Sequence, residues 1–275
     1  MKRIISKIRN FIATVRAHRS MPLRLEFVVS DYCNLNCKGC THYSPLAPDE
    51  FESIATLERS AAHLGTTVGH DIGDVYIIGG EPLLYPRLTD AMEMMRRHFP
   101  DNSIKLFTNG LLLPRMNDEF WLAAKRHRII IALTIYPIKF DYDAAQALCA
   151  RHGIECMIFG DRRAENSFMR FGLDPTKKQN ARLSHFKCFN RGCISVIGDK
   201  IYPCSISGCV RHLNNACGTS FEHQPGDWLN VADVKTAKQI KALRDNPVPF
   251  CRYCNPNPTV TDYGHSRRDK HEWTD

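Results

Sequence analysis

The strongest constraint on the fold is a regular alternation of short apolar runs and helical patterns through residues 23–160. The apolar runs are rich in β-branched residues, which is typical of buried strands, and the segments between them have the periodicity of helices of about 10–13 residues. Strands and helices that alternate in this way form βα units, in which helices cover a parallel sheet. The five expected strands are residues 23–30, 74–80, 103–110, 128–136 and 154–160.

The number of these units predicts an α/β fold built as a partial (β/α)6 barrel of the TIM type. Five or six βα units fit into about 160 residues, whereas a complete TIM barrel needs eight. The expected helices are residues 56–68, 88–99, 118–127 and 141–153, and Asp141 and Gly153 are typical start and stop residues for the last of them.

The pattern changes after Gly160. The next stretch is polar and aperiodic, and residues 193–204 then predict a small hairpin between two cysteines. The last part of the chain holds seven of the twelve cysteines and has little apolar periodicity, so we expect a small appendage held together by metal. We divide the chain into an N-terminal helix (1–20), a barrel core (21–160), and a final barrel segment with a cysteine-rich domain (161–275).

Composition narrows the class of protein. The chain is 43% hydrophobic, which suits a globular core, and no run of roughly 18 apolar residues predicts a membrane span. Basic residues recur through the first twenty positions where a secretory signal would have an apolar centre. Twelve cysteines without an export signal therefore indicate metal binding or catalysis in a reducing cytoplasm rather than a disulfide framework. The net charge of +8 is compatible with an anionic substrate or with thiolate-bound clusters.

Residues 1–20 have apolar side chains on one helical face, basic side chains mostly elsewhere, and no acidic residue. This pattern predicts an amphipathic helix that packs on the domain or on a partner subunit. The alternative is a helix that lies on an anionic membrane surface, which would make the protein peripheral to the membrane.

Cys33, Cys37 and Cys40 follow directly after the first expected strand. Catalytic groups of parallel α/β architectures lie at the carboxyl ends of strands, so these thiols are expected on the active face. Thiolates are the ligands of iron–sulfur clusters, and three of them on a four-iron cluster leave one iron open to a small molecule. The alternative is a zinc site whose fourth ligand comes from elsewhere in the chain.

The spacing Cys33-x3-Cys37-x2-Cys40 resembles the signature of the radical S-adenosylmethionine (radical SAM) superfamily. The resemblance implies that S-adenosylmethionine chelates the open iron of a [4Fe–4S] cluster and is cleaved reductively to a 5′-deoxyadenosyl radical, which abstracts hydrogen from a substrate. It also implies a reductase of the flavodoxin or ferredoxin type as electron donor. Gly39 departs from many members, which have an aromatic residue before the third cysteine.

Other strand ends extend this resemblance. Gly79, Gly80 and Glu81 resemble the family's GGE motif, whose backbone carbonyls and carboxylate suit the amino group of S-adenosylmethionine. The remaining strand-end residues resemble positions that meet the ribose or carboxylate of the cofactor, although Asn-Gly is also ordinary turn chemistry. These residues are Thr108, Asn109 and Thr134.

The C-terminal part resembles the auxiliary-cluster domains of the same superfamily, the SPASM type and the shorter twitch type. The resemblance implies that Cys188, Cys204, Cys251 and Cys254 hold one auxiliary [4Fe–4S] cluster, with Cys193 as the competitor of Cys188. Zinc remains an alternative, because CxxC pairs suit it equally well. Cys149 and Cys156 are interpreted as small core residues, and Cys209 and Cys217 as loop residues of open role.

Three reactions remain open. A fully ligated auxiliary cluster suits the oxidation of an alcohol, which needs a base such as Asp161 or Tyr136, with Arg162 and Arg163 near an anionic group. Epimerisation of a sugar carbon needs a thiol that returns hydrogen, for which Cys193, Cys209 and Cys217 are candidates. Peptide modification is the third reaction.

The layout of the motifs also resembles uncharacterised radical SAM proteins of surface-polysaccharide pathways. We therefore expect a small-molecule substrate such as a carbohydrate, aminocyclitol or nucleotide sugar. No nucleic-acid motif is present. A non-enzymatic alternative is an iron–sulfur electron carrier or a zinc-stapled binding module.

Overall fold

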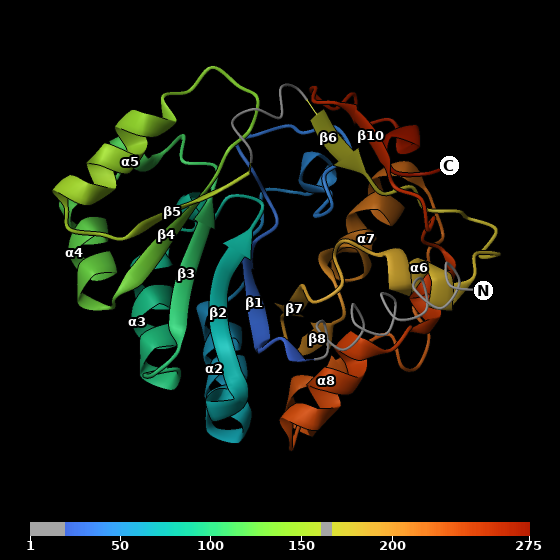
Figure 1. Cartoon of the computed structure of the whole chain (residues 1–275), viewed down its shortest axis with the longest axis horizontal. Helices are drawn as coiled ribbons and strands as arrows, with labels where there is room; N and C mark the ends of the chain where they lie inside the picture. Colours follow the sequence, from blue (N-terminus) through green and yellow to red (C-terminus); the bar gives the residue numbers. More distant parts are fainter. Residues whose placement is uncertain (1–19, 161–166) are drawn as a thin grey trace, which may run out of the picture.

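A mostly parallel sheet runs through the molecule in the order β5-β4-β3-β2-β1-β7-β8-β9 (Figure 1). The computed structural model describes residues 20–160 and 167–275. The predicted N-terminal helix and Asp161, Arg162 and Arg163 lie outside these ranges. The strands of the sheet are β1 (Leu23–Ser30), β2 (Ile72–Gly79), β3 (Ser103–Thr108), β4 (Ile129–Thr134), β5 (Cys156–Phe159), β7 (Ile194–Ile197), β8 (Lys200–Tyr202) and β9 (Leu229–Asn230).

Neighbouring strands from β5 to β7 are all parallel, which confirms the predicted α/β class. In a simple continuation of the series, the sixth parallel strand would pair with β5. The sixth strand is instead β7, which pairs with β1. β8 and β9 then add antiparallel pairs, so the predicted hairpin is confirmed and extends the main sheet. Its turn contains Gly198, whose φ of +61° lies in the left-handed region that favours glycine.

Helices connect the strands as expected from the sequence. Asn117 caps α4 by accepting a hydrogen bond from the Phe120 N–H at 3.0 Å, and Asp141 caps α5 through the Ala144 N–H at 2.8 Å. The α-helices are α2 (Ile54–Val68), α3 (Leu88–His98), α4 (Asp118–Arg126), α5 (Tyr142–Arg151), α6 (Ala181–Lys187), α7 (Ser205–Cys217) and α8 (Ala237–Asp245). Short 3-10 helices are η1 (Ser44–Leu46), η2 (Gly69–Asp71), η3 (Pro82–Leu84), η4 (Leu113–Arg115), η5 (Val231–Asp233), η6 (Pro249–Arg252) and η7 (Lys270–Glu272).

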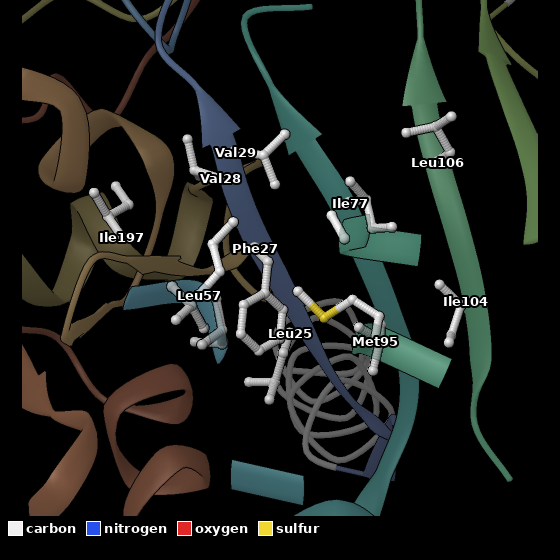
Figure 2. Packing of buried hydrophobic residues seen from close by; sticks show 14 of the residues in the cluster. Leu25, Phe27, Val28, Val29, Leu57, Ile77, Met95, Ile104, Leu106 and Ile197 are labelled. Carbon is white, nitrogen blue, oxygen red and sulfur yellow. The ribbon is translucent and has the colours of Figure 1, made fainter. Parts of the chain in front are cut away.

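The main core lies between one face of the sheet and α2 and α3. Figure 2 shows the side chains of Phe27, Leu57 and Met95 pointing toward one another, and all three are buried. The Phe27 ring also meets the Phe99 ring edge-on, with centroids 5.9 Å apart. Cys149 belongs to this core and Cys156 packs against it, as predicted.

The opposite face of the same strands is polar and aromatic, because side chains alternate between the faces of a strand. The Arg24 guanidinium and the Lys105 ammonium each lie 5.4 Å from the centroid of the Tyr76 ring. Glu26, on the same face of β1, is buried and forms an ion pair with Arg24 at 3.2 Å.

A second, two-stranded antiparallel sheet is formed by β6 (Ser167–Arg170) and β10 (Thr259–Asp262). It lies at the top of Figure 1, the end toward which the arrows of β2 and β3 point. The last strand and the segment after it therefore return to the carboxyl ends of the parallel strands. Among the described residues, no helix has the length and apolar character required to cross a membrane.

Candidate functional site

The loop that follows β1 holds Cys33, Cys37 and Cys40. The loop turns back between the second and third cysteines, where the Cys40 N–H donates to the Cys37 carbonyl oxygen at 3.3 Å. Gly39 has a φ of +73° in this turn, a conformation that a residue with a side chain adopts only at a cost. The Leu35 N–H donates to the Cys33 Sγ at 3.3 Å, a contact that stabilises a sulfur carrying negative charge.

The three thiols lie close enough to influence one another's ionisation. Burial raises the pKa of Cys37 to about 12, and the Cys40 thiol adds to this increase. Burial also raises the pKa of Cys33, with Glu81 and the other two cysteines contributing. Such thiols become thiolates when a positively charged metal binds them. A group of three thiols with a backbone N–H donor is a donor set that fits an iron–sulfur cluster.

Gly79 and Gly80 fix the position of this loop by packing directly against its start. A Cβ atom on Gly79 would lie 2.3 Å from the Ser30 carbonyl oxygen, and one on Gly80 would lie 2.2 Å from the Tyr32 carbonyl oxygen. The Gly80 N–H donates to Ser30 O at 2.7 Å, and the Glu81 N–H donates to Tyr32 O at 2.9 Å. Only residues without side chains permit this approach, which places the GGEP loop beside Cys33.

Glu81 is buried, and its carboxylate joins two strand ends. It accepts hydrogen bonds from the Leu83 N–H at 3.0 Å, the Thr108 hydroxyl at 2.7 Å and the Asn109 N–H at 2.9 Å. Burial raises the pKa of Glu81 to about 7, although these three hydrogen bonds oppose the increase. A carboxylate offers about four acceptor positions, and three of those of Glu81 are used by internal hydrogen bonds. Glu81 therefore has a structural role in holding the site together. One acceptor position remains for the amino group that Glu81 is predicted to bind.

Asn109 connects the end of β3 to the cysteine loop. Its side-chain amide donates to the Asn34 Oδ1 at 2.7 Å and lies 3.9 Å from the Cys33 Sγ. Thr108 and Asn109 are thus brought together with Glu81 and Cys33, as the sequence predicts. Thr134 ends β4 and is half-buried, and within the described part of the chain its side chain forms no hydrogen bond with these residues.

Tyr136 follows β4 and faces the cysteine loop. Burial raises its pKa well above the usual value for tyrosine, and the nearby thiols of Cys37, Cys40 and Cys33 raise it further. Its backbone is fixed by the Tyr142 hydroxyl, which lies 2.9 Å from the Tyr136 nitrogen. Its phenol therefore stays protonated near neutral pH.

A second group of thiols gathers in the C-terminal part. Cys188, Cys204, Cys251 and Cys254 all line one cavity of about 40 Å³. Cys204 follows the β7–β8 hairpin directly, and Cys251 and Cys254 lie in and just after η6. Burial raises the pKa of Cys254 well above the usual value for cysteine, and Cys251, Cys204 and Cys188 add to the increase. Four mutually close thiols are a complete ligand set for one four-iron cluster.

The other cysteines of this part lie differently. Cys193 does not line the cavity, and its sulfur accepts a hydrogen bond from the Arg24 guanidinium at 2.9 Å. Cys209 and Cys217 belong to α7, so their interpretation as loop residues is wrong. Cys209 is buried, which accounts for it as a small core residue. Across the described ranges, no three His, Cys, Asp or Glu side chains are arranged as ligands of a single metal ion.

Two aromatic residues at this site were missed by the sequence analysis. Tyr43 is buried, and its burial raises its pKa well above the usual value for tyrosine, with the thiols of Cys254, Cys204, Cys209 and Cys40 adding to the increase. Its neighbours thus include thiols of both groups. Tyr263 lies with its hydroxyl 3.5 Å from the Cys37 Sγ. The position of Tyr43 three residues after Cys40 was a usable signal, whereas nothing in the sequence links Tyr263 to Cys37.

Comparison with known proteins identifies the family of the domain that holds Cys33, Cys37 and Cys40, the first thiol group. Residues 27–155 match the family described as the Radical SAM superfamily. This chain carries a radical SAM domain. Its cofactors are accordingly a [4Fe–4S] cluster and S-adenosylmethionine, and Cys33, Cys37 and Cys40 have the spacing and position to hold the cluster.

Curated relatives of this chain include two proteins named GTP 3′,8-cyclase. That of Alkaliphilus oremlandii is 32% identical over 112 residues, which cover 41% of this chain and 35% of the relative. That of Peptoclostridium acidaminophilum is 29% identical over 163 residues, which cover 59% of this chain and 47% of the relative. The chain thus spans less than half the length of each relative.

A solved structure of BtrN in complex with AdoMet and 2-DOIA resembles this chain over most of its length. The match covers 86% of this chain and 94% of BtrN, with a TM-score of 0.52 and 14% sequence identity. This similarity supports the fold, including the C-terminal part that the family match does not reach.

Proposed function

We propose that this protein is a radical SAM enzyme that oxidises an alcohol carbon of a carbohydrate, aminocyclitol or nucleotide sugar to a ketone. The observation that carries this proposal is the gathering of Cys188, Cys204, Cys251 and Cys254 around one cavity. A cluster with four protein ligands has no open iron for a substrate, but it can accept an electron.

When bound, the first cluster and S-adenosylmethionine supply a 5′-deoxyadenosyl radical, and the second cluster supplies an electron acceptor. In the overall reaction, the alcohol carbon gives a hydrogen atom to the 5′-deoxyadenosyl group and its hydroxyl gives a proton to a base. The remaining electron would be accepted by the second cluster, which Cys188, Cys204, Cys251 and Cys254 would hold, and a reductase of the flavodoxin or ferredoxin type would supply the electron that splits S-adenosylmethionine. The products are a ketone, 5′-deoxyadenosine and methionine.

Tyr136 is suited to hold the substrate oxygen. Its phenol faces the three-cysteine loop, and its raised pKa makes it a hydrogen-bond donor rather than a base. This leaves Asp161, two residues after Phe159 in the sequence, as the proposed base.

The position of Cys193 disfavours this thiol as the hydrogen donor that epimerisation requires, whereas Cys209 and Cys217 remain candidates for that role. The Cys193 sulfur binds Arg24 near the amino end of β1, whereas the first thiol group follows Ser30 at the carboxyl end. Six residues of strand at about 3.3 Å per residue separate these two positions by roughly 20 Å. A thiol that returns hydrogen to a substrate radical would need to lie at the carboxyl end.

A nucleotide is the second candidate substrate, because the relatives in Alkaliphilus and Peptoclostridium are named GTP 3′,8-cyclase. The full set of four C-terminal thiols supports the alcohol-oxidation proposal instead, since it leaves the second cluster no free iron for a nucleotide. The need for reduced clusters further suggests a reducing compartment such as the cytoplasm.

Deuterium transfer tests the substrate class. The anaerobically reconstituted protein, S-adenosylmethionine and a reductant are incubated with carbon-deuterated sugars, aminocyclitols, nucleotide sugars and GTP. We expect deuterium in 5′-deoxyadenosine and a ketone product from a member of the first three groups. Transfer from GTP alone would favour the nucleotide alternative. If no 5′-deoxyadenosine formed under any condition, the enzyme proposal would be wrong and the electron-carrier alternative would be favoured.

A further inference from the structure

The segment after β10 packs along the whole cysteine loop of the radical SAM domain. The Lys38 N–H donates to the Gly264 carbonyl oxygen at 2.8 Å, and the Ser266 N–H donates to the Asn36 carbonyl oxygen at 2.8 Å. Cys37 itself forms an antiparallel bridge with His265. The backbone on both sides of the second cysteine is therefore held by residues more than 200 positions away in the sequence.

The same segment also holds the third cysteine. The indole N–H of Trp273 donates to the Cys40 carbonyl oxygen at 2.8 Å, and Trp273 is buried. A Cβ atom on Gly39 would lie 3.4 Å from the Glu272 carbonyl oxygen. The space beside Gly39 is thus bordered by the C-terminal segment.

Tyr263 is the side chain of this segment that reaches a thiol. Its hydroxyl oxygen lies 3.5 Å from the Cys37 Sγ. The ring is held between two other aromatic rings, with centroids 6.2 Å from Tyr136 and 6.0 Å from Phe168. The hydroxyl is therefore positioned by packing as well as by its own hydrogen bond.

This hydrogen bond has a direct consequence for a metal held by Cys37. A ligating cysteine is a thiolate, so the tyrosine hydroxyl is the partner with a proton to donate. A hydrogen bond to a cluster sulfur draws negative charge away from the iron and stabilises the reduced state more than the oxidised state. The reduction potential of the cluster rises as a result.

We propose that Tyr263 is a positioning residue that raises the reduction potential of the cluster held by Cys33, Cys37 and Cys40, and that the C-terminal segment is thereby part of the radical SAM site. This inference rests on the proposed function, because it requires a cluster at the first thiol group. It assigns the control of the first electron-transfer step to a residue outside the radical SAM domain.

The test is a potentiometric titration of the full-length protein and its Tyr263→Phe variant, followed by electron paramagnetic resonance. The signal of the first cluster is identified by its change on addition of S-adenosylmethionine. Because the signal counts only chains that hold the cluster, partial occupancy does not obscure the potential. The matched control is Tyr85→Phe, which removes a hydroxyl bonded to the Glu52 carbonyl oxygen instead of to a thiol.

We expect Tyr263→Phe to retain its iron and to have a more negative midpoint potential than both the wild-type protein and Tyr85→Phe. An unchanged potential in Tyr263→Phe would overturn the inference while leaving the proposed function intact. Complete loss of the first cluster in a folded Tyr263→Phe would also overturn it, because the hydroxyl would then serve assembly. A wild-type protein without any cluster at this site would instead contradict the proposed function itself.

Discussion

Glu81 illustrates how one buried side chain organises the candidate site. Its carboxylate receives hydrogen bonds from two backbone N–H groups and one hydroxyl, which come from η3 and from the end of β3. A buried donor that loses its acceptor costs about 1–3 kcal/mol. Glu81, which the motif resemblance predicts to bind the cofactor, is therefore also a structural link between two strand ends.

We expect Glu81→Gln to lower the free energy of unfolding by about 1–3 kcal/mol, because its amide group would face one of these donors. The substitution should also change the pH dependence. Burial raises the pKa of Glu81 from 4.5 to about 7, so its contribution to stability is fully present below pH 4.5 and is lost as the pH rises through 7.

At about 1.4 kcal/mol per pKa unit, this loss in the wild-type protein amounts to roughly 3 kcal/mol. Urea titrations at several pH values between 4.5 and 8 measure it. The decline attributable to Glu81 should be absent from Glu81→Gln and present in the control Glu119→Gln, whose residue is exposed on α4. If the free energy of unfolding depended on pH in the same way in all three proteins, Glu81 would not be the group responsible for the decline.

At the scale of elements, the junction between the end of β2 and the cysteine loop depends on the absence of side chains. We expect Gly80→Ala to cost about 1–3 kcal/mol, since the new methyl group would lie 2.2 Å from the Tyr32 carbonyl oxygen and force the backbone apart. The first thiol group should lose iron while the second retains it. Gly69→Ala is the control, because its Cβ atom would have its nearest neighbour at 3.8 Å.

Measurements of unfolding free energy and iron content distinguish these two variants. Gly80→Ala with full iron at the first group would mean that the loop accommodates the methyl group without moving Cys33. Gly69→Ala should remain close to the wild-type protein in both measurements, because its helical φ of −52° suits alanine.

The second thiol group gives a prediction at the same scale. If each group holds a four-iron cluster, the wild-type protein carries about eight irons. Cys251→Ala should lower this number toward about four, because it removes one ligand from the cavity. Cys193→Ala should leave the number unchanged, since Cys193 binds Arg24 outside that cavity. Iron analysis of both variants after reconstitution tests this prediction. Loss of iron from Cys193→Ala but not from Cys251→Ala would mean that Cys193, and not Cys251, is a ligand.

For the molecule as a whole, the sequence predicts local patterns well and long-range contacts poorly. The βα alternation, the hairpin turn at Gly198 and the grouping of Thr108 and Asn109 with Glu81 follow from periodicity and strand-end position. The pairing of β7 with β1 does not, because a parallel strand at either edge of the sheet gives the same periodicity.

The contacts of the C-terminal segment with the cysteine loop are long-range contacts that the sequence does not predict either. The segment's basic and aromatic residues have no periodicity, so no sequence rule connects Tyr263 or Trp273 with the cysteine loop. The four-thiol cavity is an intermediate case. The hairpin spacing favoured Cys188 over Cys193, and the cavity is lined by Cys188.

The central claim is that Cys33, Cys37 and Cys40 leave one iron open for S-adenosylmethionine. Electron–nuclear double resonance of the reduced protein tests it most directly, with S-adenosylmethionine labelled with ¹⁵N in its amino group or ¹⁷O in its carboxylate. The account predicts hyperfine coupling of both labels to the first cluster and loss of the coupling in Cys37→Ala. A reduced, intact cluster without coupling to either label would contradict it, because the fourth iron would then have a ligand other than S-adenosylmethionine.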